Sequence, residues 1–136
     1  MNRSVIIERE FKHRPEKVWR ALTQGALIED WLMKNDFRPV EGHRFRFRAE
    51  PMPQWDGIVE GEVLTVEPLK RLSYRWDASE NLRTVVTWTL TETPAGTHLR
   101  MEQSGFRPED EFNYRGAGYG WQKFIAALDD VLGRLE

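Results

Sequence analysis

Two acidic residues near the middle of the chain have a spacing that acid–base chemistry can use. Glu60 and Glu62 lie two residues apart in an alternating stretch. If the inward phase of a strand there continues from Leu64, both carboxylates face the interior, where burial raises a carboxyl pKa and can supply an acid or a base. A bulge at Gly61 would instead return both to solvent and turn Val63 inward. Because unpaired buried acids are costly, the bulged arrangement is favoured.

Other residue types that carry chemistry are sparse. The chain has no cysteine, which excludes disulfides, thiolate catalysis and cysteine-based zinc sites. His13, His43 and His98 lie far apart without the spacing of a metal-binding motif, and His13 and His98 are expected at the surface near strand ends. No serine, histidine and acid grouping accompanies a nucleophile turn. The sequence therefore assigns no catalytic residue, no metal site and no cofactor.

Arginine alternates with phenylalanine in one short stretch. Arg44, Arg46 and Arg48 share one face of a predicted strand, and Phe45 and Phe47 share the other. A solvated arginine face is the favoured interpretation because acids are abundant nearby; a docking surface for an acidic protein partner is the alternative. The net charge of -2, with both signs interspersed, does not indicate a nucleic-acid partner.

Several aromatic side chains with polar tips have the properties needed to orient a bound ring. Tyrosine and tryptophan combine a flat apolar face with a hydrogen-bonding group, and a ligand pocket uses both. Large inward residues of a half-buried sheet are more often simply core, and that remains the alternative. The residues predicted to contact a ligand are Phe47, Tyr74, Trp76, Trp88, Met101, Gln103, Tyr119, Trp121 and Phe124.

The elements that position these side chains follow from hydrophobic periodicity. Residues 5–12 alternate as a strand, after which Pro15 opens a short helix over 15–22, and a second short helix follows over 26–32. From 35 to 103 the period is two, with glycine and proline turns between short segments, which favours an antiparallel meander. The further strands are predicted around 45–47, over 57–67, around 72–76, and over 84–92 and 98–103.

A long amphipathic helix is predicted after Pro108, running to about Leu135, with its apolar stripe packed on the apolar face of the sheet. Gly116 and Gly120 would share a helix face next to Trp121. Their missing side chains either leave room between helix and sheet or permit a kink or close packing. The stripe consists of Trp121, Phe124, Ile125, Leu128, Val131, Leu132 and Leu135.

Particular sequence words occur in this same order along almost the whole chain. They are PEKVWRALT at 15–23, EGHRFRFR at 41–48, GEVLTVEPLKRLSYRW at 61–76, VVTWTLTET at 85–93, THLRMEQSGF at 97–106 and GW at 120–121. With these words the chain resembles the activator of heat-shock chaperone ATPase homologue family, within the START-like or SRPBCC superfamily of helix-grip folds that includes Bet v 1. It carries Gly42-His43 where family members usually have Gly-Gly.

The resemblance implies one α+β domain over residues 1–136. Its fold would be a curved antiparallel sheet of six or seven strands wrapped around a long C-terminal helix, with two short helices after the first strand. The resemblance also implies a cavity between sheet and helix that binds hydrophobic small molecules in many relatives. The superfamily includes lipid carriers, polyketide cyclases and chaperone regulators, so the fold places a site without setting its chemistry.

The predicted function is therefore binding of a small apolar or aromatic ligand, for carriage, sequestration or sensing. The alternatives are a protein-interaction module that regulates a chaperone ATPase, and a cyclase or aromatase acting on a polyketide-like substrate. The N-terminal MNRSVIIEREF alternates like a strand, so it indicates neither a signal peptide nor a membrane span. We expect a cytoplasmic protein, as a monomer or homodimer.

Overall fold

The structure is a computed structural model that describes residues 2–53 and 55–135. It contains a seven-stranded antiparallel sheet with strand order β1-β7-β6-β5-β4-β3-β2. The elements in chain order are β1 (Arg3–Phe11), α1 (Pro15–Thr23), α2 (Gly25–Trp31), β2 (Lys34–Asn35), β3 (Arg44–Arg48), β4 (Ile58–Glu67), β5 (Arg71–Ser79), β6 (Leu82–Thr93), β7 (Gly96–Phe106), the 3₁₀ turn η1 (Pro108–Asp110) and α3 (Glu111–Arg134).

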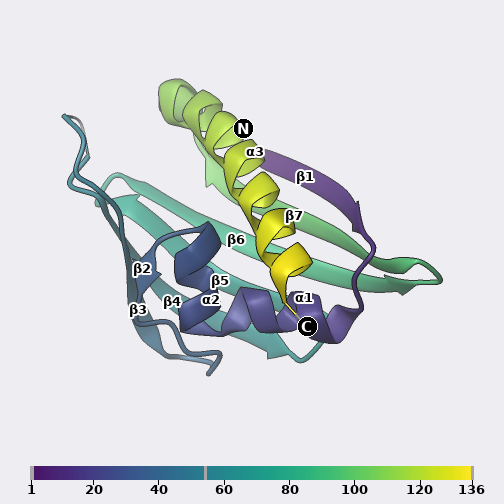
Figure 1. Ribbon diagram of the computed structural model, residues 1–136. Coiled ribbons are helices and arrows are strands. Elements are labelled where there is room, and N and C mark those ends of the chain that lie inside the picture. Colours follow the sequence, from purple (N-terminus) through teal and green to yellow (C-terminus); the bar gives the residue numbers. More distant parts are fainter. Residues whose placement is uncertain (1, 54, 136) are drawn as a thin grey trace.

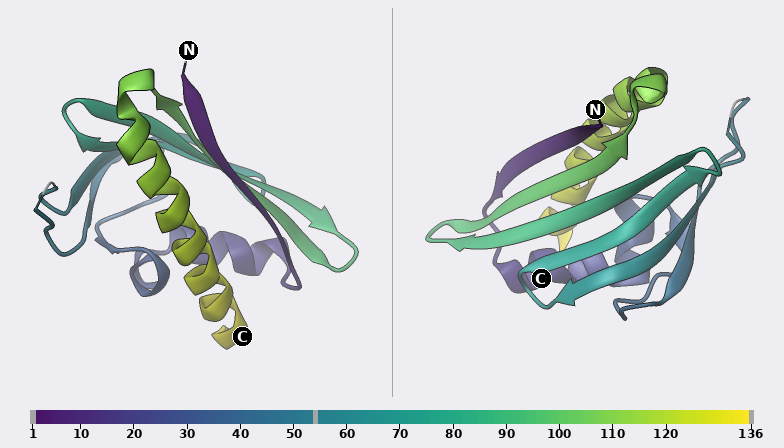
Figure 2. Two further views of the ribbon diagram at one scale, coloured as in Figure 1. Left: turned by 90° about the horizontal axis from the view of Figure 1, so that it is seen from above. Right: turned by 180° about the vertical axis from the view of Figure 1, so that it is seen from behind.

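The molecule has two layers. The long helix α3 crosses one face of the curved sheet, and α1 and α2 lie on that same face beside the C-terminal half of α3 (Figure 1). Seen from behind, the strands face the viewer and no helix covers them (Figure 2). The α+β helix-grip architecture predicted from the sequence is confirmed, with two short helices after β1 and one long helix at the end.

The alternation of the strands separates an apolar inner face from a charged outer face. Successive side chains of a strand point to opposite sides, so one covered face buries every second residue. On β3, for example, Phe45 and Phe47 are buried whereas Arg44, Arg46 and Arg48 are exposed. The inner faces of β3, β5, β6 and β7 bury Phe45, Phe47, Leu72, Tyr74, Trp76, Val86, Trp88, Leu90, Leu99, Met101 and Gln103.

Strand β4 contains a bulge, but not where we expected it. The register of β4 against β5 shifts between Val63 and Thr65, so the extra residue is Leu64, which is exposed. Gly61 instead has a packing role on the inner face. A Cβ at this position would lie 2.3 Å from Phe45 Cζ and 2.5 Å from the Arg75 carbonyl oxygen. Glycine at 61 therefore makes room for the phenylalanine ring of β3.

The two short helices are joined by one buried hydrogen bond. Pro15 opens α1, where its missing N–H costs nothing, and the inner side of that helix carries the buried Val18. At the end of α2, Trp31 Nε1 donates to the carbonyl oxygen of Ala21 in α1 at 2.9 Å. This bond holds Trp31 over the sheet, where its ring meets Trp88 edge-on.

Helix α3 is continuous through its glycines. It runs from Glu111 to Arg134 without interruption, and its buried residues begin at Trp121. Gly116 is exposed, and a Cβ at Gly116 or Gly118 would meet nothing within 4 Å. Gly116 therefore neither leaves room between helix and sheet nor permits close packing there, because the space beside it lies on the solvent side. A kink at this glycine stays a prediction. Among the described residues, no helix is long and apolar enough to cross a membrane.

Candidate functional site

A continuous layer of aromatic rings fills the space between the sheet and α3. Its rings come from the inner faces of β3, β5 and β6 and from α3, through Phe47, Trp76, Trp88 and Trp121. The ring centroids are 5.3 Å apart for Phe47 and Trp76, 5.1 Å for Trp76 and Trp121, and 5.6 Å for Trp88 and Trp121. These separations are those of favourable tilted and edge-to-face contacts. Trp88 is 0% exposed and Trp121 is 2% exposed, so the layer is packed in this conformation.

The layer approaches solvent along the middle of α3. Phe124 contacts Trp121 with centroids 5.6 Å apart and is itself only half-buried. Further along α3 toward its C-terminus, Ile125 and Leu128 are fully buried. Toward its N-terminus, no side chain between Glu111 and Gly120 is buried. Full burial of α3 side chains is therefore confined to the part of the helix from Trp121 onward.

A chain of three hydrogen bonds ties α3 to the sheet. Trp121 Nε1 donates to Gln103 Oε1 at 2.7 Å, and Gln103 Nε2 donates to Thr84 Oγ1 at 2.9 Å. Thr84 Oγ1 in turn donates to the carbonyl oxygen of Trp76 at 2.7 Å. Each side-chain polar group that takes part in these three hydrogen bonds has a partner, which is the condition for burying it without a large penalty. All the side chains involved are uncharged.

Tyr74 supplies a second polar group in the interior. Trp88 Nε1 donates to the Tyr74 hydroxyl at 2.9 Å. Burial raises the pKa of the Tyr74 phenol above its ordinary value, so the group stays neutral over the physiological pH range. The hydroxyl hydrogen has no acceptor among the described residues. Tyr74 is thus a buried donor that a ligand oxygen could use.

Eight of the nine predicted contact residues belong to this interior, and one does not. Tyr119 is 78% exposed on the outer side of α3. It stands two positions before Trp121, and two positions correspond to about 200° around a helix, so the two side chains point in opposite directions. The prediction that Tyr119 lies in the interior together with Trp121 was wrong. The ligand-binding role of the other eight stays a prediction.

The sequence reasoning missed two interior residues. Thr84 connects Gln103 to the backbone of β5, and its inward phase two residues before Val86 was a usable signal. Phe37 packs against Tyr74 with centroids 5.5 Å apart, although it lies in the connection between β2 and β3, outside any periodic segment. No local pattern marked that second contact.

The acidic residues first considered for catalysis lie outside. Glu60 pairs with Arg46 at 3.1 Å on the outer face, and Glu62 pairs with Arg75 at 3.5 Å. The favoured outward orientation of both carboxylates is confirmed, and the aromatic layer and its hydrogen-bond partners include no carboxylate or imidazole among the described residues. The buried Asp110 lies instead just before α3, where it pairs with Arg107. No group of three histidine or acidic side chains within the described ranges could hold a metal ion.

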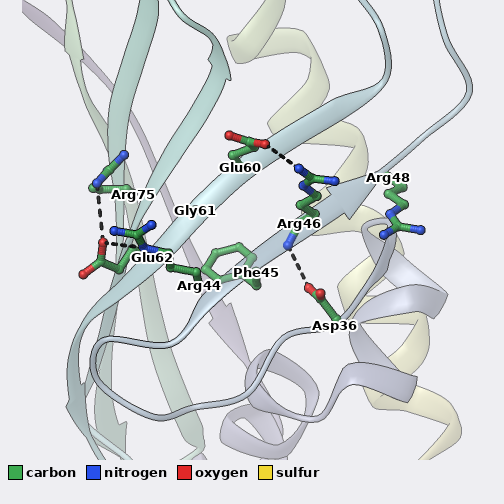
Figure 3. A pocket seen from close by; sticks show the side chains of 9 residues that line it. All are labelled: Asp36, Arg44, Phe45, Arg46, Arg48, Glu60, Gly61, Glu62 and Arg75. Carbon is green, nitrogen blue, oxygen red and sulfur yellow. Dashed lines mark hydrogen bonds and ion pairs between the residues drawn. The ribbon is translucent and has the colours of Figure 1, made fainter.

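The two hollows described for this structure lie outside the aromatic interior. One, of about 470 Å³, lies over the outer face of β3 and β4 (Figure 3). It is bordered by the predicted arginine face, where Arg46 and Arg44 pair with Glu60 and Glu62 and Arg48 forms no ion pair with a described residue. The other, of about 520 Å³, lies between the start of α1 and the β4–β5 turn.

Comparison with known proteins agrees with this architecture. The sequence profile of the family described as "Activator of Hsp90 ATPase homolog 1-like protein" matches residues 12–133. The chain belongs to this family. The Hsp90 ATPase activator homologues are members of the START-like or SRPBCC superfamily, whose fold is a ligand-binding fold. No curated protein matches the chain.

Three solved structures illustrate how the family fold recurs. Protein MLL2253 from Mesorhizobium loti is 54% identical, with a TM-score of 0.92 over 98% of this chain and 99% of the other. DynU16, a protein of the dynemicin biosynthetic locus, is 24% identical, with a TM-score of 0.82 over 96% of this chain and 47% of the other. CalU16 from Micromonospora echinospora is 23% identical, with a TM-score of 0.81 over 98% and 78%. The similarity to DynU16 and CalU16 shows a shared fold.

Proposed function

We propose that the protein binds a small, uncharged, largely apolar ligand between the sheet and the N-terminal half of α3. The observation that carries this proposal is the aromatic layer itself, whose polar groups belong to neutral side chains such as Gln103, Thr84 and Tyr74. An ionised ligand would find no opposite charge there and would lose its hydration without compensation. A neutral ring or alkyl group would gain about 25 cal/mol for each Å² of apolar surface removed from water.

The ligand must displace side chains in order to enter. Because the layer is packed, binding requires Phe124 and Trp121 to move away from the sheet, together with the helical turn that carries them. The start of α3 and the segment between β3 and β4 extend at the same end of the molecule, which is where we place the entrance (Figure 2). A ligand oxygen would then accept the hydrogen of the Tyr74 hydroxyl, adding orientation to the burial of apolar surface.

Intrinsic tryptophan fluorescence tests this proposal directly. Titration with 1-decanol and with decanoate at pH 8 compares two ligands that have alkyl chains of equal length but differ in charge. We expect saturable quenching by decanol and a much weaker response to decanoate. Tighter binding of decanoate, or no saturable binding of any compound in a wider library of neutral ring and alkyl compounds, would contradict the proposal.

Two α3 variants locate the binding site. Phe124→Glu places a charge beside Trp121 and should abolish decanol binding, whereas Phe112→Glu changes an exposed residue of the same helix and should leave it unchanged. Circular dichroism of both variants checks that the fold is retained. Equal effects of the two substitutions would place the ligand outside the interior.

The outer arginine face supports a second candidate function, docking of an acidic segment of a protein partner such as a chaperone ATPase. The exposed Arg48 and the hollow beside it are the features that favour it. Reversing Arg44, Arg46 and Arg48 to glutamate should weaken sedimentation with a purified chaperone ATPase, and Arg100→Glu on the distant β7 is the control. A complex that is absent, or equally affected by both changes, rules this candidate out.

A further inference from the structure

The outer side of α3 carries two exposed aromatic side chains in line. Phe112 is 77% exposed and Tyr119 is 78% exposed, and no other element lies in front of this helix in Figure 1. They are seven residues apart, so they lie at nearly the same angle around the helix. The same seven-residue spacing continues to Ala126 and Gly133, both exposed. The stripe thus begins with two large rings and ends with two small residues.

Two copies of this stripe are complementary in shape only when the two α3 helices run antiparallel. In an antiparallel pair of α3 helices related by a two-fold axis, one register places Phe112 of each copy over Gly133 of the other and Tyr119 over Ala126. Each large ring then meets a small residue, which allows close packing along the helix. A parallel pair would place each aromatic ring against the same ring of the other copy and Gly133 against Gly133. The two helices would then be poorly packed at the end that carries the small residues.

Charges beside the stripe favour the same register. It brings Arg115 of one copy opposite Asp130 of the other, and the two-fold axis repeats the pair. Asp130 forms no ion pair with a described residue, and the ion pair of Arg115 is a long one, 3.8 Å to Glu111 in its own helix. Oppositely charged groups across an interface set its register and suppress wrong partners.

We propose that the outer face of α3 is the interface of a homodimer in which two α3 helices pack antiparallel. The occupant is a second copy because size and charge both match when the face meets itself in reverse. This surface is separate from the aromatic interior, so the inference goes beyond the proposed ligand binding. Lys123 lies near the two-fold axis of this dimer, where two ammonium groups approach each other.

Sedimentation equilibrium over a concentration series tests the dimer. We expect a reversible monomer–dimer equilibrium for the wild type. Tyr119→Lys should raise the dimer dissociation constant at least about tenfold, as expected for a central aromatic of an interface. Leu64→Lys replaces an exposed apolar residue of the outer sheet face and should leave the constant unchanged. A wild type that stays monomeric at millimolar concentration, or a dimer insensitive to Tyr119→Lys, overturns the proposal.

A charge swap tests the register. Arg115→Asp and Asp130→Arg should each weaken the dimer, and the double variant should recover most of the lost affinity. Lys123→Ala should tighten it by removing the repulsion near the axis. Circular dichroism and thermal midpoints verify that each variant is folded. A double variant no tighter than the single ones would show that the helices do not meet in this antiparallel register.

Discussion

At the scale of single residues, neutral hydrogen bonds hold the interior together. Tyr74 is the acceptor for the Trp88 indole, and Gln103 is the acceptor for the Trp121 indole. Buried indole N–H groups require such partners, because a lost bond leaves a donor without water. The polar atoms that a ligand would use are therefore also atoms on which stability depends.

Replacing Tyr74 by phenylalanine should separate these roles. The substitution removes the acceptor of Trp88 Nε1, and we expect the free energy of unfolding in urea to fall by about 1–3 kcal/mol, the cost of an unsatisfied buried donor. Tyr119→Phe removes an exposed hydroxyl and should change it by less than about 0.5 kcal/mol. Equal effects of the two changes would mean that the Trp88–Tyr74 bond contributes nothing to stability.

His98 provides a pH-dependent contact between β7 and β1. Its two ring nitrogens meet the carboxylates of Glu10 and Glu8, which raise the pKa of His98 above 6.5. A raised folded-state pKa means that this stabilisation is complete below the unfolded-state pKa and is lost as pH rises through the folded-state value. The stability advantage of the wild type over His98→Gln should therefore shrink as pH rises from below 6.5 through the raised folded-state pKa of His98. An advantage that grows over this range would contradict the assignment.

At the scale of elements, the glycines of β4 and α3 have opposite roles. Gly61 faces inward beneath Phe45, so Gly61→Ala forces overpacking and should lower the free energy of unfolding by about 1–3 kcal/mol or more.

Gly116 is exposed within a helix and touches nothing within 4 Å at its Cβ position. Gly116→Ala should therefore raise stability by about 0.5–1 kcal/mol. Urea unfolding of the Gly61→Ala and Gly116→Ala variants at low protein concentration tests both predictions. Changes of the same sign in the free energy of unfolding of the two variants would be inconsistent with these roles.

The elements were largely predictable, because alternation in a strand covered on one face is a strong constraint. A single phase in each strand placed Phe47, Tyr74 and Trp88 correctly inside. The bulge was misplaced because an extra residue such as Leu64 has no distinctive side chain, whereas Gly61, the obvious candidate, serves the Phe45 ring. Local periodicity does not report such contacts between neighbouring strands.

The candidate site was less predictable than the fold. The Trp121–Gln103–Thr84 chain joins a helix to two strands, so no local sequence pattern encodes it. Tyr119 was misassigned because it was chosen for its aromatic ring with a polar tip, although the helical angle separates it from Trp121. Whether the interior is packed or open depends on how closely α3 lies on the sheet, which follows from all the inward side chains together.

At the scale of the whole molecule, packing against the sheet is uneven along α3. The buried side chains of this helix begin at Trp121, while the turns before it contribute only half-buried contacts such as Tyr114. Segments with few buried contacts open at low cost in free energy. Ligand entry by displacement of Trp121 and Phe124 would use this difference.

Amide hydrogen exchange should reveal the uneven packing. We expect residues 111–120 of α3 to exchange faster than residues 121–134 in the free protein. Saturation with decanol should slow exchange around Trp121, provided that the ligand binds inside. Uniform exchange along α3, measured by mass spectrometry of overlapping peptides, would mean that the helix opens as one unit.

The closeness of three indoles in the interior has an optical consequence. Trp121 lies 5.1 Å from Trp76 and 5.6 Å from Trp88, centroid to centroid. Transition dipoles this close and differently oriented mix their excited states, so the folded protein should show an exciton couplet of indole in its ultraviolet circular dichroism. A guest molecule that wedges between the rings would collapse the couplet, whereas a compound adsorbed on the exterior would leave it intact.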